Sequence, residues 1–163
     1  MFNIFKKKNE KTIVEFKSPL NGKTVSIEAV PDPVFSEKMM GEGIAVEPTN
    51  DVVVAPFDGV VKMLMPNSGH AVGILNKQGI EVLLHIGLET VGLQGEGFNV
   101  LVNQGDEIKC GQPLVEIDRE FIESKNLPLI TMMVVTNPNG YTPNTFNIDQ
   151  DVSSDTTIMT YTK

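Results

Sequence analysis

Short alternations of apolar and polar residues dominate the chain from Ile13 onward, and turns rich in glycine and proline separate them. This period of two is typical of β-strands with one buried face, and helical spacing is scarce. Residues 18–22 and 55–59 each place a proline-containing turn that ends in glycine ahead of such a strand. This weak repeat favours an all-β fold, a single-domain antiparallel β-sandwich or barrel of short strands. One or two short helical turns are expected, at 34–40 and 118–126.

The chain has only two histidines, and they lie on neighbouring strands of one predicted hairpin. His70 begins the first strand and His85 ends the second. If Leu75 pairs with Ile80 across the intervening turn, His70 lies directly opposite His85. Side chains opposed in this way have Cβ atoms about 4.5–5.5 Å apart on one face of the sheet. We therefore predict that the two histidines share one site.

The same register divides the apolar side chains of the hairpin between two faces, because successive side chains alternate. Beside the histidines it places three residues: Val72, Ile74 and Leu83. On the opposite face it places the others: Leu75, Ile80, Val82 and Leu84. A register shift of one residue would send the two histidines to opposite faces.

Two facing histidines are compatible with three chemistries. A metal site would need further ligands, from Glu89 or another chain, because two histidines supply only half of a usual zinc shell. Acid–base hydrolysis would need an activated nucleophile or a metal-bound water. Ser68 is near His70 in the sequence but lies in a predicted turn, and Cys110 has no histidine near it, so neither has a recognisable nucleophile context.

Carriage of a phosphoryl group on a histidine is the third chemistry, and the sequence favours it. A neutral imidazole nitrogen is nucleophilic when the other ring nitrogen donates to a fixed acceptor. The chain after His85 reads Ile86-Gly87, a strand end at which backbone carbonyls are accessible for that purpose. The second histidine can donate to the phosphoryl oxygens. An apolar rim would exclude water from the labile N–P bond.

Composition narrows the class of protein. The 163 residues are 40% hydrophobic and can bury one core, and the single cysteine excludes an intramolecular disulfide. No apolar run approaches the length of a membrane span and no signal-peptide pattern opens the chain, so we expect a cytoplasmic protein. The net charge of −8 disfavours nucleic acid as a partner and favours a basic protein.

The start of the chain differs in charge from the rest. Residues 1–11 contain four lysines and one glutamate, a local charge of +3 that leaves −11 for the remainder. We predict a flexible basic segment at 1–12 and one domain at 13–163. Because residues 1–8 combine apolar side chains with three lysines, contact with an anionic membrane surface is one interpretation. A solvated, frayed terminus is the other.

The stretch Gly79–Val91, which reads GIEVLLHIGLETV, carries the most specific resemblance to a known family. Its apolar residues run into Leu-Leu-His and continue as Ile-Gly-Leu-x-Thr-Val. Supporting matches lie in four other stretches: 30–38, 41–45, 54–59 and 95–98. Over nearly its whole length the chain resembles the glucose-type enzyme IIA of the bacterial phosphoenolpyruvate:sugar phosphotransferase system.

The resemblance implies a β-sandwich-like fold and a phosphotransferase component that works through a phosphohistidine, not a free-standing hydrolase. It implies that His85 accepts the phosphoryl group from the phosphocarrier HPr and passes it to a cysteine in the IIB domain of a sugar permease. His70 would support the phosphoryl group, and the family's active-site threonine corresponds to Ser68. No cofactor and no metal are implied, and we expect a monomer.

The resemblance also implies a docking surface for these partners. Its apolar part would consist of seven residues: Val34, Phe35, Met39, Met40, Ile44, Val46 and Val91. Acidic contacts to a basic HPr surface would come from Asp32 and Glu89. Glu89 stands where the family usually has aspartate, and Met39 and Met40 replace more common β-branched residues.

Two other families share parts of the pattern. Residues 54–59 and 102–112 resemble biotinyl- or lipoyl-type carriers, but the sequence lacks the Met-Lys-Met hairpin that such carriers modify. A metallopeptidase of similar β architecture would need a third protein ligand and a bound metal. Because the chain starts at Met1 and ends near its last predicted strand, we expect a stand-alone IIA protein.

Overall fold

The computed structural model describes residues 12–65 and 67–163, and short strands make up most of this part of the chain. In sequence order the strands are β1 (Ile13–Lys17), β2 (Gly22–Ser26), β3 (Glu42–Pro48), β4 (Val52–Val54), β5 (Gly59–Leu64), β6 (Ala71–Asn76), β7 (Glu81–Ile86), β8 (Phe98–Val100), β9 (Glu107–Ile108), β10 (Pro113–Ile117), β11 (Thr131–Asn137), β12 (Thr142–Phe146), β13 (Asp151–Val152) and β14 (Thr157–Thr162). The helical elements are η1 (Ile27–Ala29), α2 (Pro33–Ser36), η2 (Thr90–Leu93) and α3 (Arg119–Ser124).

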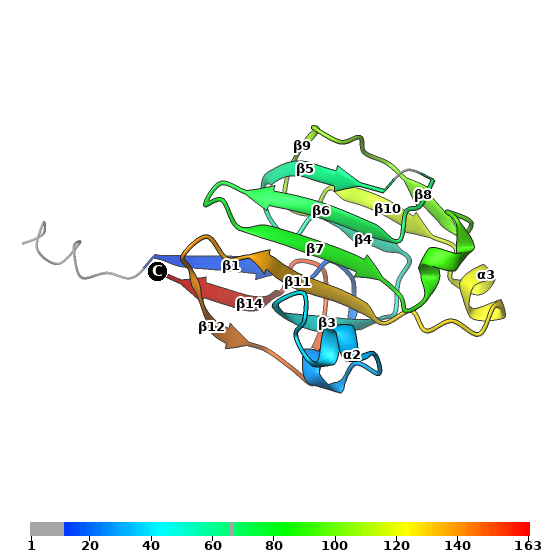
Figure 1. The fold of residues 1–163 in the computed structure, drawn as a ribbon, viewed down its shortest axis with the longest axis horizontal. Coiled ribbons are helices and arrows are strands. Elements are labelled where there is room, and N and C mark those ends of the chain that lie inside the picture. The colour runs from blue at the N-terminus through cyan, green and yellow to red at the C-terminus, as the bar shows by residue number, and fades with distance from the viewer. Residues whose placement is uncertain (1–11, 66) are drawn as a thin grey trace, which may run out of the picture.

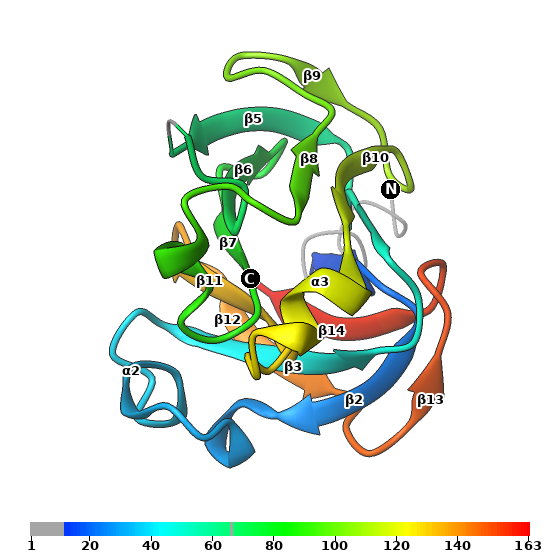
Figure 2. The ribbon, with the colours of Figure 1, turned by 90° about the vertical axis from the view of Figure 1, so that its right-hand side faces the viewer.

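These strands form antiparallel sheets that enclose one main core. The largest sheet has the order β13-β2-β3-β11-β7-β6-β5-β9, and two three-stranded sheets have the orders β1-β14-β12 and β4-β10-β8. Figure 1 shows β5, β6, β7 and β11 side by side across one face, and Figure 2 shows the sheets curving around the interior. This arrangement confirms the predicted all-β sandwich.

The main core packs against the inward face of the central strands. Val82, Leu84 and Ile86 of β7 are almost completely buried in it. Because side chains alternate along a strand, His85 points to the outer face of the sheet. Burial of each large apolar side chain contributes about 1.5–3 kcal/mol, so the strand that carries His85 is firmly held in place.

The two glycines of the sequence repeat have the same structural role. Gly22 begins β2 and Gly59 begins β5. A Cβ atom added to Gly22 would lie 2.0 Å from the carbonyl oxygen of Glu47, and one added to Gly59 would lie 2.1 Å from that of Leu75. Only glycine allows two backbones to approach so closely. The repeat therefore reflects two similar strand pairings, β2 with β3 and β5 with β6.

The register of the hairpin formed by β6 and β7 differs by one residue from the predicted register. Leu75 pairs with Glu81, so the prediction that it pairs with Ile80 is wrong. The pair Asn76 and Ile80 closes the turn, because the backbone N–H of Asn76 donates to the carbonyl oxygen of Ile80 at 3.1 Å. The Oδ1 atom of Asn76 accepts hydrogen bonds from the backbone N–H groups of Gln78 at 3.0 Å and Ile80 at 2.9 Å. These bonds hold Ile80 opposite Asn76, so the loop consists of residues 77–79 and is one residue shorter than predicted.

The observed register changes the faces of β6 but not those of β7, as a slip of one residue requires. Val72 and Ile74 are buried in the core, so their predicted place beside the histidines is wrong. Leu75 lies on the outer face, which is also contrary to prediction. Leu83 lies beside His85, as predicted.

The helix expected at 118–126 is present as α3, the one expected at 34–40 is confined to α2 at Pro33–Ser36, and an aspartate caps each of them. The Oδ1 atom of Asp32 accepts a hydrogen bond from the N–H of Val34 at 2.9 Å, at the start of α2. The Oδ1 atom of Asp118 accepts one from the N–H of Phe121 at 3.1 Å, at the start of α3. Such capping bonds satisfy N–H groups that have no partner within the helix.

The flexible basic segment was predicted at residues 1–12, and residues 1–11 of it lie outside the described residues. The membrane contact expected of residues 1–8 therefore stays a prediction. Within residues 12–65 and 67–163, no helix combines the length and the apolar character needed to cross a membrane.

Candidate functional site

A depression of about 420 Å³ on the outer face of the large sheet contains both histidines. Strands β5, β6 and β7 supply its floor, and α2 and the segment around η2 supply its rim. The residues that line it are Asp32, Val34, Phe35, Met40, Met63, Met65, His70, Ala71, Leu83, His85, Glu89 and Val91. The wall is mostly apolar, and its polar side chains are the two histidines and the carboxylates of Asp32 and Glu89.

The backbone holds the ring of His85 in one orientation. Its Nδ1 donates a hydrogen bond to the carbonyl oxygen of Gly87 at 2.9 Å. Because a carbonyl only accepts, Nδ1 carries the proton and Nε2 keeps a free lone pair in the neutral ring. Gly87 has a φ of +75°, and a Cβ there would lie 2.6 Å from Cγ2 of Thr90 and 2.8 Å from the carbonyl oxygen of Pro128. Glycine is therefore required at this position.

His70 lies just before β6, which begins at Ala71, so strand alternation does not fix the direction of its side chain. Its carbonyl accepts a hydrogen bond from the N–H of Ile86 at 2.6 Å, which ties it to the end of β7. The hydroxyl of Ser68 is hydrogen-bonded to its Nδ1. The imidazole rings of His70 and His85 are 5.0 Å apart, with an angle of 80° between their planes. The two histidines meet as expected, although the register that was expected to bring them together is wrong.

Burial lowers the pKa of both histidines below the ordinary value of 6.5. For His70, burial is the main cause of the lower pKa, and the proximity of His85 adds to it. For His85, burial again lowers the pKa, while the Gly87 carbonyl and the Asp32 carboxylate act in the opposite direction. The lowered pKa favours the neutral ring, which is the form that can act as a nucleophile.

Three of the predicted docking residues are buried. The ring of Phe35 lies 5.0 Å from the ring of His85, and only 4% of Phe35 is exposed. Phe35 therefore packs against His85 inside the site and offers little surface to a partner. Ile44 and Val46 are completely buried in the main core, and their predicted contact with a partner is wrong. Strand β3 is covered on both faces, because Ala45 lies in a second apolar cluster with Phe35.

The other predicted docking residues lie at the surface around the depression. Five of them line it: Asp32, Val34, Met40, Glu89 and Val91. Met39 is adjacent to Met40 in the chain and is the most exposed of the large apolar residues of the described chain. Glu89 adopts a left-handed conformation, with φ of +59°, at the start of η2. The rim therefore combines apolar side chains with two carboxylates.

Three lining residues escaped the sequence prediction: Met63, Met65 and Ala71. The alternation of β5 is interrupted by a bulge between Val61 and Met63, which obscured the face to which these side chains belong. Gly73 of β6 was the available signal. It pairs with Met63, and a Cβ added there would lie 3.1 Å from the Cβ of Met63. A glycine within an apolar strand marks such an approach.

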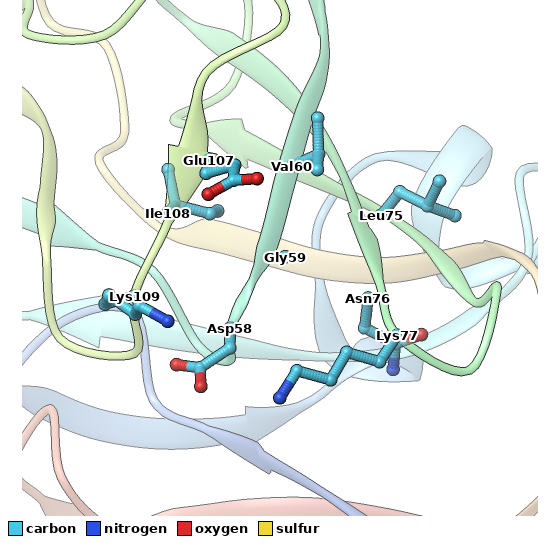
Figure 3. Close-up of a pocket in the computed structure, with 9 residues that line it drawn as sticks. All are labelled: Asp58, Gly59, Val60, Leu75, Asn76, Lys77, Glu107, Ile108 and Lys109. Atoms are coloured by element: carbon cyan, nitrogen blue, oxygen red, sulfur yellow. The ribbon is translucent and has the colours of Figure 1, made fainter.

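A second hollow, of about 310 Å³, lies at the opposite ends of β5 and β6 (Figure 3). Charged side chains surround it, among them Asp58, Lys77 and Lys109, and no histidine lines it. Cys110 is nearby, because its backbone N–H donates to Asp58 at 2.8 Å, and burial raises the pKa of its thiol. In the described residues, no cluster of three or more His, Cys, Asp or Glu side chains could hold a metal ion.

Comparison with known proteins identifies the family. The sequence profile of the family described as "phosphoenolpyruvate-dependent sugar phosphotransferase system, EIIA 1" matches residues 14–141. The chain belongs to this family. As an EIIA protein it is a phosphotransferase component with a phosphoryl-carrier role in sugar uptake, and the resemblance seen in its sequence is confirmed.

Individual EIIA relatives support the assignment. The glucose-specific EIIA component of Bacillus cereus is 47% identical over 140 residues, which cover 86% of this chain and 82% of that protein. The glucose-specific EIICBA component of Staphylococcus carnosus is 54% identical over 125 residues, 77% of this chain but only 18% of that longer protein. The glucose permease IIA of Mycoplasma capricolum matches in structure with a TM-score of 0.86 at 32% identity, over 91% of this chain and 96% of that one.

Proposed function

We propose that His85 carries the phosphoryl group, on Nε2, between the phosphocarrier HPr and a cysteine of a permease IIB domain. In the first step the N–P bond of phosphorylated HPr breaks as a bond forms between phosphorus and Nε2. In the second step the cysteine sulfur attacks phosphorus, an S–P bond forms, and the N–P bond to His85 breaks. The observation that supports this role is the bond from Nδ1 to the Gly87 carbonyl, which leaves Nε2 as the only nucleophilic nitrogen of the ring.

His70 supports the transferred group in this proposal. Its ring is 5.0 Å from that of His85, which places it within reach of the phosphoryl oxygens attached there. When the Ser68 hydroxyl donates to Nδ1 of His70, Nε2 carries the proton and can donate to those oxygens. A donor positioned before the reaction stabilises charge that spreads over the phosphoryl oxygens during a loose transfer. Ser68 is then a positioning residue, which acts through His70.

The rim of the depression receives both partners. Val34, Met40 and Val91 offer apolar surface, and flexible methionine side chains adapt to more than one partner. Asp32 and Glu89 add negative charge beside the histidines, and the chain carries a net charge of −8. This charge would accelerate encounter with a basic surface such as that expected of HPr. Apolar contact would then exclude water from the phosphohistidine.

Longer relatives support a IIB domain as one partner. The Staphylococcus carnosus and Corynebacterium glutamicum proteins are named as fused EIICBA and EIIBCA components, and the chain spans less than a fifth of their length. Such fusions support an A component that works beside a B component. A monomeric state, a cytoplasmic location, the boundary at residue 13 and membrane contact through residues 1–8 belong to the same proposal.

Incubation with phosphoenolpyruvate, enzyme I and HPr, followed by intact-mass measurement, tests the proposal. We expect a gain of one phosphoryl group that is lost in acid, because N–P bonds are acid-labile. The variant His85→Ala should show no gain. A stable gain, or one that persists in His85→Ala, would show that the phosphoryl group is not carried on this ring.

A further inference from the structure

The methionines of the described chain fall into two sharply separated groups. Met132, Met133 and Met159 are completely buried in the core, with 0% exposure. The other four are Met39, Met40, Met63 and Met65, whose exposed fractions range from 38% to 69%. No described methionine has an intermediate exposure. Water-borne reagents therefore reach one group and not the other.

The exposed group, which we call the rim methionines, gathers at a single place. Met40, Met63 and Met65 line the depression that contains the histidines, and Met39 is the chain neighbour of Met40. Two come from the segment after α2 and two from β5 and its end. Two segments that are separated in the sequence thus place thioether groups at the same rim. A role in filling space does not explain this, because a side chain that fills space is buried.

We propose that the rim methionines are an oxidation site through which two-electron oxidants, such as hydrogen peroxide, weaken the docking of phosphoryl donor and acceptor. This inference rests on the proposed function. A thioether sulfur attacks one peroxide oxygen, an S–O bond forms as the O–O bond breaks, and the departing hydroxide takes the proton of the transferred hydroxyl group to give water. Each methionine is oxidised to the sulfoxide and each peroxide is reduced to water. Thiol-dependent methionine sulfoxide reductases reverse the change.

Oxidation of the rim would act on docking and leave the transfer chemistry intact. A sulfoxide is polar, so a rim methionine that loses its apolar character gives up the gain from excluding water at the partner interface. The hydrogen bond from His85 to the Gly87 carbonyl and the contact between Ser68 and His70 involve no methionine. The expected signature is therefore a higher KM for phosphorylated HPr with an unchanged kcat.

The exposed thiol of Cys110 is the competing target for peroxide in the described chain. It lies near the second hollow, at the opposite end of β5 from Met63 and Met65. Although Cys110 is exposed, the partial burial of its thiol raises the pKa of that group. The higher pKa lowers the fraction of reactive thiolate. The substitution Cys110→Ser removes this target without touching the depression, so it is the background for every measurement.

The test compares peroxide-treated and untreated full-length Cys110→Ser protein. Peptide mass mapping should find added oxygen at the four rim methionines and not at Met132, Met133 or Met159. Phosphorylation by phosphorylated HPr should then show a KM about tenfold higher after treatment, which corresponds to about 1.4 kcal/mol of docking free energy. A sulfoxide reductase should restore the KM. The matched variant replaces all four rim methionines with leucine, and its treated and untreated KM values should agree.

Three results would overturn the inference. Oxidation of the buried methionines before the rim would remove its structural basis. An equal loss of activity in the leucine variant after peroxide would place the damage elsewhere, and an unchanged KM in the oxidised protein would separate oxidation from docking. Failure of the proposed function is distinguishable, because it would appear as absent phosphorylation in the untreated protein.

Discussion

Two hollows on the outer face of the large sheet occupy the two ends of the same strands and differ in chemistry. Ala71 and Leu75 of β6 are four residues apart, so their side chains share a face. Ala71 lines the depression of the histidines and Leu75 lines the hollow of Figure 3. The volumes are similar, about 420 and 310 Å³. The two hollows therefore resemble each other in size and in position on the sheet, and they differ in their side chains.

The two hollows differ in the charge state of the ionisable side chains that line them. In the depression, burial lowers the pKa of His70 and His85 and favours the neutral form of each ring. In the second hollow, the backbone N–H of Cys110 is the main cause that lowers the pKa of Asp58, and Lys109 and Lys77 add to it. That carboxylate is held charged among ammonium groups, whose nitrogens have no lone pair to offer. Of the two hollows, only the depression contains neutral imidazole rings.

The largest expected effect comes from removing the nucleophile. We expect His85→Gln to abolish phosphorylation by HPr, because no other group in the depression is held with a free lone pair toward the donor. The double variant Lys77→Ala/Lys109→Ala empties the second hollow of two charges and should be phosphorylated at the wild-type rate. Rapid-quench measurement of both rates checks the contrast. A wild-type rate in His85→Gln, or a large loss in the lysine variant, would reverse the roles of the two hollows.

The next effect concerns the support given by His70. The variant His70→Gln should still accept phosphate on His85 but should pass it to IIB about 10²–10³-fold more slowly, as expected when one preorganised donor is lost. Ser68→Ala should slow the same step less, because it removes only the group that orients His70. Single-turnover transfer from purified phosphoprotein measures both. Wild-type transfer by His70→Gln would show that the second ring has no part in the reaction.

A smaller effect is expected when the carbonyl that orients His85 is displaced. The substitution Gly87→Ala forces the Cβ against Thr90 and Pro128, and a displacement of this kind can slow transfer by up to about 10²-fold. Strain at a left-handed position also costs about 1–3 kcal/mol of folding free energy. Gly111 is the matched control, because its φ is +85° but an added Cβ would meet no atom within 4 Å.

Phosphorylation rates and urea denaturation of Gly87→Ala and Gly111→Ala separate the two contributions. Both variants should lose stability, and only Gly87→Ala should also lose rate. Equal rates in the two variants would mean that the Gly87 carbonyl does not set the orientation of the ring.

The smallest effect is on stability as a function of pH. Because the pKa of each histidine is lower in the folded protein than the ordinary 6.5, the unfolded chain takes up protons first as the pH falls. The free energy of unfolding should therefore decrease as the pH falls through 6.5 toward the lowered values. Asp58, whose pKa lies below 3.8 when folded, should add a separate loss only as the pH falls through that value.

Urea denaturation across these two pH windows tests the assignment. The double variant His70→Gln/His85→Gln should flatten the upper window alone, and Asp58→Asn should flatten the lower window alone. A wild-type slope around 6.5 in the histidine variant would show that burial does not perturb these rings.

Sequence reasoning reached the fold and the histidine pair, but part of its route was wrong. Alternation gives the faces of β7 correctly, because that strand is regular. It fails for β6, because Asn76 lies opposite Ile80 across a loop of three residues, 77–79, where four were predicted. The histidines still meet, since His70 lies before the strand and is free of its alternation. The hydrophobic pattern of a hairpin does not show which two residues close its turn.

Some residues that were predicted for a docking surface are buried. A pattern of apolar residues in β3 does not say whether a second cluster covers its outer face, and here Ala45 is buried on that face while Ile44 and Val46 enter the main core. The bulge of β5 likewise breaks the alternation of that strand, so the faces of Met63 and Met65 could not be predicted from it. Residues carried over from loops and helix ends, such as Val34 and Val91, line the depression, and their contact with a partner stays a prediction.

The central claim is that the Gly87 carbonyl keeps the proton of His85 on Nδ1, so that Nε2 is the nitrogen that bonds to phosphorus. It is tested most directly by nuclear magnetic resonance of the phosphorylated protein labelled with ¹⁵N in histidine. We expect the ³¹P coupling to appear on Nε2 of His85, with Nδ1 still protonated and hydrogen-bonded. Coupling to Nδ1 of His85, or to either nitrogen of His70, would contradict the account.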